Sequence, residues 1–216
     1  MKGLIMKKTF IAIALSLASV TMVGGTASAF GLGSIFGGGK TAKTQSKVTP
    51  EIIVKKYAIG TKSVLAGHEN MLSALDFRDE AAKVKMSLKK ITGDPNTAAD
   101  DDTQTVITES AKLIDEKLNG EELSLSGKAK QEVTKAMLNL GKGLIAYKGM
   151  ASDVKAYQPD ATSIGGAAGA AITIVKAVPG DTNNLYSLLS NLVKYAKGHG
   201  ITVPKDATKA LAGGAW

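Results

Sequence analysis

Residues 126–157 read SGKAKQEVTKAMLNLGKGLIAYKGMASDVKAY, and they hold the most regular amphipathic pattern in a chain of 216 residues. Apolar side chains recur there every three or four positions, which places them on one face of a helix. These side chains are Ala129, Val133, Met137, Leu140, Leu144, Tyr147, Ala151 and Val154. Ser126 stands where the N-cap of that helix is expected. Gly141, Gly143 and Gly149 lie inside the pattern at a cost of about 1 kcal/mol each relative to alanine, so we expect close helix packing or a bend there.

The same helical period is present upstream of this segment. Thr49 and Pro50 form a helix start, since proline is favoured at the first helical position. Apolar residues follow at intervals of three, four or seven as far as Ile91, and Gly93 begins a firm stop. The pattern fits either one long helix or two helices bent near Asp76.

Helical patterns also continue downstream. Further helices are predicted at 106–118, 161–178 and 182–197. The Pro-Gly-Asp sequence at 179–181 predicts a break between the last two, because proline ends a helix and aspartate caps the next one. A short terminal helix is expected from Asp206.

No stretch shows the sustained alternation of polar and apolar residues that is typical of a strand, so the sequence predicts an all-α fold. We expect a single domain over residues 49–216. Helices joined by short loops pack as antiparallel neighbours, which favours an antiparallel helical bundle of about five to seven helices.

The first 29 residues have the three parts of a Sec-type signal peptide. A lysine-rich start precedes an apolar run at 10–20 that is too short to span a bilayer. Ala27 and Ala29 then form the small-x-small pattern that signal peptidase cleaves, which would leave Phe30 as the first mature residue. From Met6 onward, the run MKKTFIAIALSLASVTMVGGTASA resembles the signal peptides of Gram-negative outer-membrane and periplasmic proteins. The protein is therefore expected to be periplasmic or secreted.

Residues 30–48 read FGLGSIFGGGKTAKTQSKV, and their glycine content predicts a flexible N-terminal segment. Four large apolar side chains within it could tether the chain to a membrane or to a partner. They are Phe30, Leu32, Ile35 and Phe36. The run SIFGGGKT is close to a phosphate-binding loop, but a serine replaces the first glycine and no strand precedes it. No cofactor is therefore expected.

Few residue types in this chain can carry chemistry. It has no cysteine, two histidines and one arginine, which excludes disulfides, thiol nucleophiles and zinc ribbons. His68 lies on the apolar side of its helix and is expected to be a partly buried, hydrogen-bonded core residue. His199 sits between two glycines in a helix-ending loop. Neither histidine belongs to a recognisable triad, so a non-catalytic protein is predicted.

An acidic run at 94–102 (DPNTAADDD) invites comparison with a calcium-binding loop. The spacing fails, because Ala98 and Ala99 occupy the fifth and sixth positions and Thr105 the last. We expect these carboxylates to stabilise helix N-termini instead, and no metal site is predicted.

The most unusual segment is the glycine- and alanine-rich stretch 164–178. Its small residues predict a site of close helix packing, made by Gly165, Gly166, Gly169 and Ala170. An alternative is that the segment inserts into a membrane as part of a pore-forming protein. Its uncharged apolar run of 12 residues is too short to span a bilayer.

The chain carries 27 basic and 19 acidic residues, a formal charge of +8 that falls to +5 once the three lysines of the leader are removed. The arginine clusters and interleaved aromatics of nucleic-acid binders are missing, so no nucleic-acid partner is expected. The positive charge suits an anionic lipid surface or an acidic protein partner.

The sequence thus predicts an exported, non-catalytic protein that binds an envelope partner as an accessory, scaffold or chaperone-like factor. One alternative is a membrane-active protein that uses 164–178. The other is a hydrolase that uses a pair of helix-borne carboxylates.

Overall fold

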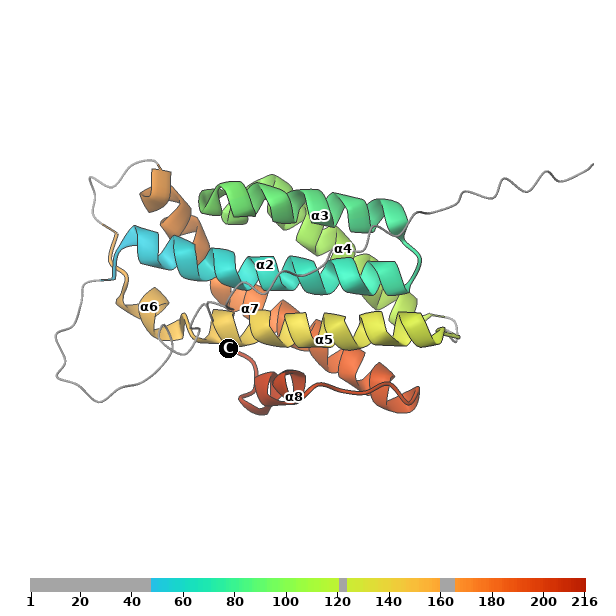
Figure 1. Cartoon of the computed structure of the whole chain (residues 1–216). Coiled ribbons are helices and arrows are strands. Elements are labelled where there is room, and N and C mark those ends of the chain that lie inside the picture. The colour runs from blue at the N-terminus through green and yellow to red at the C-terminus, as the bar shows by residue number, and fades with distance from the viewer. Residues whose placement is uncertain (1–47, 121–123, 160–165) are drawn as a thin grey trace, which may run out of the picture. The chain divides into compact units, whose positions relative to one another are not determined.

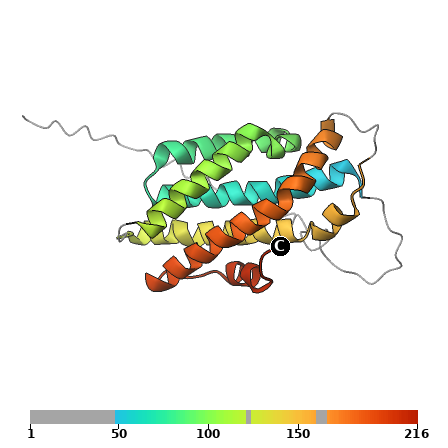
Figure 2. The ribbon, with the colours of Figure 1, turned by 180° about the vertical axis from the view of Figure 1, so that it is seen from behind.

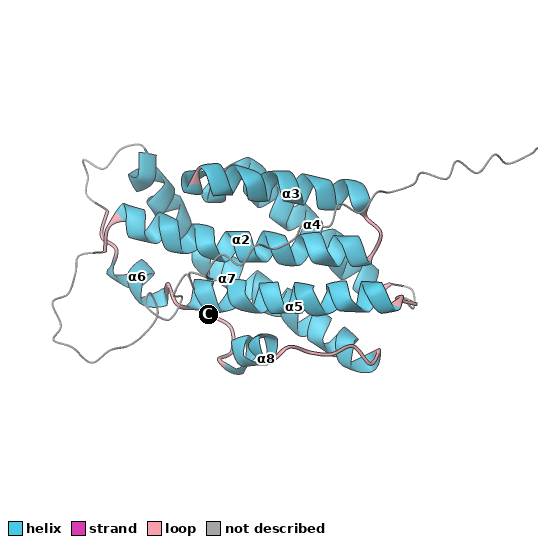
Figure 3. Cartoon of the chain, viewed as in Figure 1, coloured by secondary structure: helices cyan, strands magenta, loops and turns pink. Residues whose placement is uncertain are grey.

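The structure is a computed structural model, and it describes residues 48–120, 124–159 and 166–216. All regular elements in that part are helical, which confirms the predicted all-α class there (Figure 3). In chain order they are α2 (Pro50–Ala74), α3 (Arg78–Gly93), the 3-10 helix η1 (Pro95–Ala99), α4 (Asp101–Asn119), α5 (Gly127–Lys148), α6 (Ala151–Ala156), α7 (Gly166–Gly198) and α8 (Lys205–Ala212).

The predicted signal peptide and nearly all of the glycine-rich segment after it lie outside the described residues. The same holds for the predicted cleavage residues, the predicted tether residues and one of the four residues predicted to pack closely. These are Ala27, Ala29, Phe30, Leu32, Ile35, Phe36 and Gly165.

Helices α2 and α5 make the most extensive helix–helix contact in the described part of the chain (Figure 1). They run antiparallel, because Gly60 of α2 lies beside Tyr147 near the end of α5. Further along α2, Gly67 lies beside Leu140 of α5. The apolar stripe predicted for this part of the chain faces the contact. Its fully buried members are Val133, Met137, Leu140, Leu144 and Tyr147.

Glycines allow the two helices to approach each other closely. A Cβ atom added at Gly60 would lie 2.5 Å from Cε1 of Tyr147, and one added at Gly143 would lie 2.8 Å from Cγ2 of Val64. Atoms cannot pack at such distances, so both positions need glycine for steric reasons. The close packing predicted for the glycines of α5 is therefore confirmed at Gly143, and α2 supplies a matching glycine.

The close packing expected around residues 165–170 is not found at the glycines that the structure describes. A Cβ atom added at Gly166 or Gly169 would meet no described atom within 4 Å. Gly166 has a φ of 55°, a left-handed conformation that glycine adopts without strain. The conformation of the backbone therefore explains why glycine occupies this position. Ala170 is half-buried and packs against the core.

Of the two arrangements that fit residues 50–93, the structure shows two helices. Asp76 has a φ of 62°, in the left-handed region that ends helices. The backbone N–H of Phe77 then donates to the carbonyl of Leu72 at 2.9 Å, as in a Schellman cap. The bend therefore falls at Asp76, as the second alternative placed it.

Helix α5 ends at Lys148, well before residue 157, where the sequence pattern ends. Gly149 follows as the C-cap, and α6 is a separate short helix. At the other end, the side chain of Ser126 accepts the backbone N–H of Ala129 at 3.2 Å, which confirms the predicted N-cap.

Helix α7 runs unbroken from Gly166 to Gly198 through Pro179, so the predicted break at 179–181 is wrong. An internal proline removes one hydrogen bond and costs about 3 kcal/mol in a helix. Burial on both sides of the proline offsets this cost, because the buried residues keep a spacing of three or four and so lie on one face of the helix before and after Pro179. They are Ala171, Ile174, Val178, Thr182, Leu185, Leu189, Leu192 and Ala196.

Helix α7 packs against both α2 and α5, and Figure 2 shows it crossing this pair. The short helix α8 packs against α5 and α7, at the position where the sequence places a terminal helix. None of the helices in the described ranges combines the length and the apolar character that crossing a bilayer requires.

Candidate ligand-binding site

A pocket of about 190 Å³ lies between α2, α4 and α7, and one residue of α5 also lines it. We call it the central pocket. Its apolar wall consists of Val64, Ile107, Ala111, Leu185 and Leu188. Its polar wall consists of His68, Gln104, Thr108, Tyr147, Asp181 and Asn184. Thr108 and Asn184 are exposed, so they mark the rim that opens to solvent.

The spacing of these residues explains why three helices present them together. Residues three, four or seven apart share one face of a helix. The lining residues of α4 and α7 follow that spacing from Gln104 and from Asp181, and Val64 and His68 follow it on α2.

His68 is held by a serine on α4. The imidazole is 1% exposed, and its Nδ1 lies 2.6 Å from Oγ of Ser110. That Oγ also lies 2.6 Å from the carbonyl oxygen of Val106, and a carbonyl cannot donate. The single hydroxyl proton of Ser110 must lie between these two oxygens. Nδ1 of His68 therefore carries a proton and donates it to Ser110.

In this tautomer, Nε2 of His68 presents a lone pair, and no described residue donates a hydrogen bond to it. Burial lowers the pKa of His68 to about 4, because an imidazolium would lose its hydration there. The side chain is therefore neutral at pH 7. An unpaired buried acceptor costs about 1–3 kcal/mol, so a donor supplied by a ligand would bind favourably at this atom.

Asp181 of α7 is joined to α2 by a short hydrogen bond. The hydroxyl of Tyr57 donates to Oδ2 of Asp181 at 2.6 Å, and Nε2 of Gln104 donates to the same hydroxyl at 3.0 Å. Burial raises the pKa of Asp181, while the hydrogen bond from Tyr57 opposes that rise. Burial, above all, raises the pKa of Tyr57. The phenol thus keeps its proton and orients the carboxyl group.

Tyr147 brings α5 into the same network. Its ring stacks on the ring of Tyr57, with 5.2 Å between centroids and 12° between planes. The hydroxyl of Thr61 donates to the carbonyl of Tyr57 at 3.0 Å, so the hydroxyl of Tyr147 donates to Thr61 across 2.9 Å. Burial raises the pKa of Tyr147, which keeps this hydroxyl protonated.

Asp181 is the one carboxylate among the described residues that line the central pocket. Ser110 donates its proton to Val106, so His68 does not activate it as a nucleophile. The arrangement orients polar atoms and encloses an apolar surface, which suits binding.

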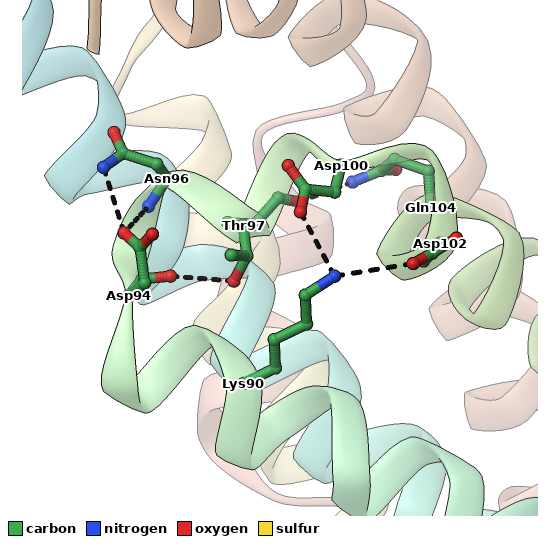
Figure 4. Close-up of polar contacts among 8 residues, drawn as sticks. Lys90, Asp94, Asn96, Thr97, Asp100, Asp102 and Gln104 are labelled. Carbon is green, nitrogen blue, oxygen red and sulfur yellow. Dashed lines mark hydrogen bonds and ion pairs between the residues drawn. The ribbon is translucent and has the colours of Figure 1, made fainter. Parts of the chain in front are cut away.

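One carboxylate of the acidic run at 94–102 caps a helix start, as the sequence predicts. The side chain of Asp94 accepts the backbone N–H two residues later, at the start of η1, at 3.0 Å. The ammonium of Lys90 lies 3.2 Å from Asp100 and 3.5 Å from Asp102, which flank the start of α4 (Figure 4). Within the described ranges, no group of three or more His, Cys, Asp or Glu side chains is placed to hold a metal ion.

Three larger hollows lie on the surface of the described domain. One of about 270 Å³ lies between α3 and α4, and one of about 730 Å³ lies beside the end of α2 and the start of α5. The third, also of about 270 Å³, lies between the end of α5, α6 and the C-terminus. Charged side chains line all three. None of their described lining residues has a buried polar atom without a partner, which distinguishes the central pocket from them.

The sequence identifies only part of this site. The burial and hydrogen bonding of His68 are confirmed. The sequence pattern assigns Asp181 to a helix break and gives no reason to single out Gln104 or Ser110. The sequence shows only where these three residues lie relative to the apolar face of their own helix. It does not show which helices pack together to form the pocket.

Comparisons of the chain with protein-family models, with curated protein sequences and with solved structures found no match. The function is therefore inferred from the geometry of the central pocket and from the sequence.

Proposed function

We propose that the mature chain is an exported, non-catalytic helical bundle that works by binding, and that the central pocket is its ligand site. The three-part leader at 1–29 supports export to the periplasm or beyond. The extensive antiparallel contact of α2 with α5, covered by α7, supports a bundle.

The observation that carries the binding proposal is the unpaired Nε2 of His68. Buried polar atoms nearly always have a hydrogen-bond partner, so each exception needs an explanation. Here the exception belongs to a histidine that lines the central pocket together with Asp181 and several apolar side chains. A ligand that donates to Nε2 accounts for the histidine, the pocket and the ordered network together.

The cellular role that we propose is that of an accessory, scaffold or chaperone-like factor of the cell envelope. The positive charge of the mature chain supports contact with an acidic protein partner or with an anionic lipid surface. The arginine and aromatic pattern of nucleic-acid binders is missing, so no nucleic-acid partner is proposed.

A membrane-active role has less support. The described part of 164–178, residues 166–178, begins α7, where Ala171, Ile174 and Val178 are buried in the core. Insertion of this segment would remove those side chains from their packing. Leakage of dye from anionic vesicles at low salt would have to be seen before this role replaced the binding role.

The binding proposal is tested on the mature chain, residues 30–216, with a set of small ammonium compounds, carboxylates and alcohols. Binding is followed by amide chemical shifts and by the melting temperature. We expect at least one class to shift amides of α2, α4 and α7 around the central pocket. If no class does so, or if the shifts map elsewhere, the pocket is not a ligand site.

A matched pair of variants separates pocket binding from surface binding. Ala111→Leu adds volume to a half-buried wall of the central pocket, whereas Ala82→Leu makes the same change on the exposed face of α3. The first change should abolish binding and the second should leave it unchanged. Equal affinities in both variants would contradict the proposed site.

A further inference from the structure

The hydrogen-bond donors on the buried polar wall of the central pocket are already used within the protein. Nδ1 of His68 donates to Ser110, and the hydroxyl of Tyr147 donates to Thr61. The two protons on Nε2 of Gln104 go to the hydroxyl of Tyr57 at 3.0 Å and to a backbone carbonyl at 2.8 Å. This wall therefore has no donor left for a ligand.

The acceptors on the same wall are not used up. Nε2 of His68 and Oδ1 of Asp181 receive no hydrogen bond from any described residue. Oε1 of Gln104 likewise receives none from the described part of the chain. Donors and acceptors occur together only at the exposed rim, at Thr108 and Asn184.

The charge of the wall and its excess of hydrogen-bond acceptors favour the same kind of ligand, a cation that donates hydrogen bonds. Asp181 forms no ion pair with any residue of the described ranges, and no lysine or arginine is among the residues that line the pocket. A half-buried carboxylate without a counter-ion is costly, and a cation within hydrogen-bond distance would stabilise it.

From this imbalance we infer that the central pocket binds a small organic ammonium ion, whose N–H groups donate to Asp181 and His68 and whose hydrocarbon part lies against the apolar wall. This inference rests on the proposed function and names the ligand class for the same site. It excludes carboxylates and phosphates, for which the buried wall has neither donors nor positive charge.

The size of the pocket limits the ligand. A cavity of about 150 Å³ holds a benzene molecule, so a pocket of about 190 Å³ suits a compound of similar or slightly larger size. Val64, Leu185 and Leu188 supply the apolar contact for its hydrocarbon part. A monoamine with a short alkyl chain satisfies both limits.

The test compares three probes of equal chain length on the mature chain at pH 7: n-butylammonium, n-butanol and n-butyrate. Affinities are measured by amide chemical-shift titration. We expect butylammonium to shift the amides around the central pocket, butanol to bind about 10-fold more weakly or worse, and butyrate to cause no shift there. Butanol or butyrate binding in the pocket as tightly as butylammonium would overturn the ligand class and leave the binding site itself intact.

Asp181→Asn tests the role of the carboxylate without removing the network. The asparagine Oδ1 can still accept the hydroxyl of Tyr57, so the fold should persist and circular dichroism can check it. Affinity for butylammonium should fall about 10- to 100-fold, as expected for a lost charged hydrogen bond. Glu109→Gln is the control, because it removes the same charge from an exposed position on α4 outside the pocket.

The remaining outcomes are also decisive. Equal losses of affinity in Asp181→Asn and Glu109→Gln would mean that butylammonium responds to overall charge, and the inference would be wrong. Absence of any shift with butylammonium would likewise overturn it. The wider set of carboxylates and alcohols used for the proposed function then decides separately whether the central pocket binds another class of ligand.

Discussion

Nδ1 of His68 on α2 lies 2.6 Å from Oγ of Ser110 on α4. Because Ser110 gives its own proton to the carbonyl of Val106, this contact fixes the tautomer of the imidazole. Nε2 is left as an unpaired acceptor on a histidine that lines the central pocket. A hydroxyl on one helix thus determines the chemistry that a second helix presents to a ligand.

The burial of His68 should make the protein less stable in mild acid. Its pKa is about 4 in the fold, against 6.5 for an unperturbed histidine, so the unfolded chain binds more protons between these values. The stabilising contribution is fully present above pH 6.5 and is lost as the pH falls toward 4. Between pH 7 and pH 4, the free energy of unfolding should fall by about 3 kcal/mol on account of this group.

Chemical denaturation at a series of pH values measures this effect, and His68→Leu provides the reference. The variant retains the carboxylates, which also titrate in acid, so the difference between the two pH profiles isolates the histidine. Parallel profiles for the two proteins would show that His68 does not titrate as its burial requires.

Ser110→Ala should both destabilise the protein and change the tautomer of His68. Removing Oγ leaves the Nδ1–H donor without a partner in the interior, at a cost of about 1–3 kcal/mol. With Oγ removed, nothing holds the proton on Nδ1, so the Nε2 tautomer should become populated. Imidazole ¹⁵N chemical shifts report the tautomer directly, and an unchanged tautomer would refute the assignment of the proton to Nδ1.

Thr103→Val, on the same helix, should have the opposite effect on stability. Thr103 is fully buried, and its hydroxyl has no hydrogen-bond partner among the described residues. Replacing the hydroxyl by a methyl group of similar size removes an unpaired polar atom, so a gain of about 1 kcal/mol is expected. A loss of stability in a urea denaturation experiment would point to a partner for this hydroxyl.

The helical pattern predicts most of the fold, because period and caps are local properties of the sequence. The buried stripe of α5, the cap at Ser126 and the start of α2 at Pro50 all follow from spacing within a few residues. The continuity of α7 through Pro179 does not, since local propensity favours a break there. It depends on burial against helices that are distant in the sequence.

The candidate site, like the continuity of α7, could be predicted from the sequence only in part. The sequence places His68 on an apolar face but cannot show that Ser110 and Asp181 lie near it. The contact of α2 with α4 and α7 is a property of the packed structure. The roles of Asp181, Gln104 and Tyr147 follow only once these helices are brought together.

Gly60→Ala should destabilise the protein although alanine favours helices. The added Cβ would lie 2.5 Å from the ring of Tyr147, which is held by stacking on Tyr57 and by a hydrogen bond to Thr61. The overpacked contact should cost about 1–3 kcal/mol, more than the gain of about 1 kcal/mol in helix propensity. Thermal unfolding should show a lower melting temperature.

Gly169→Ala is the matched comparison for that substitution. It lies inside α7, and its added Cβ would meet no described atom within 4 Å. Only the gain in helix propensity remains, so the protein should become more stable by about 0.5–1 kcal/mol. Equal effects at the two glycines would mean that close packing of α2 on α5 does not decide the outcome.

Pro179→Ala should stabilise the protein, because α7 already continues through this position. Alanine supplies the backbone N–H that proline lacks, and the carbonyl of Val175 then gains its helical partner. The gain should be about 1–3 kcal/mol if the proline distorts the helix no further. Pro50→Ala serves as the control, since proline at the first turn of α2 costs no helical hydrogen bond and its loss should change stability little. If Pro179→Ala instead lowers stability and shifts the amides around Asp181, a bend at the proline is needed to pack the second half of α7 against the central pocket.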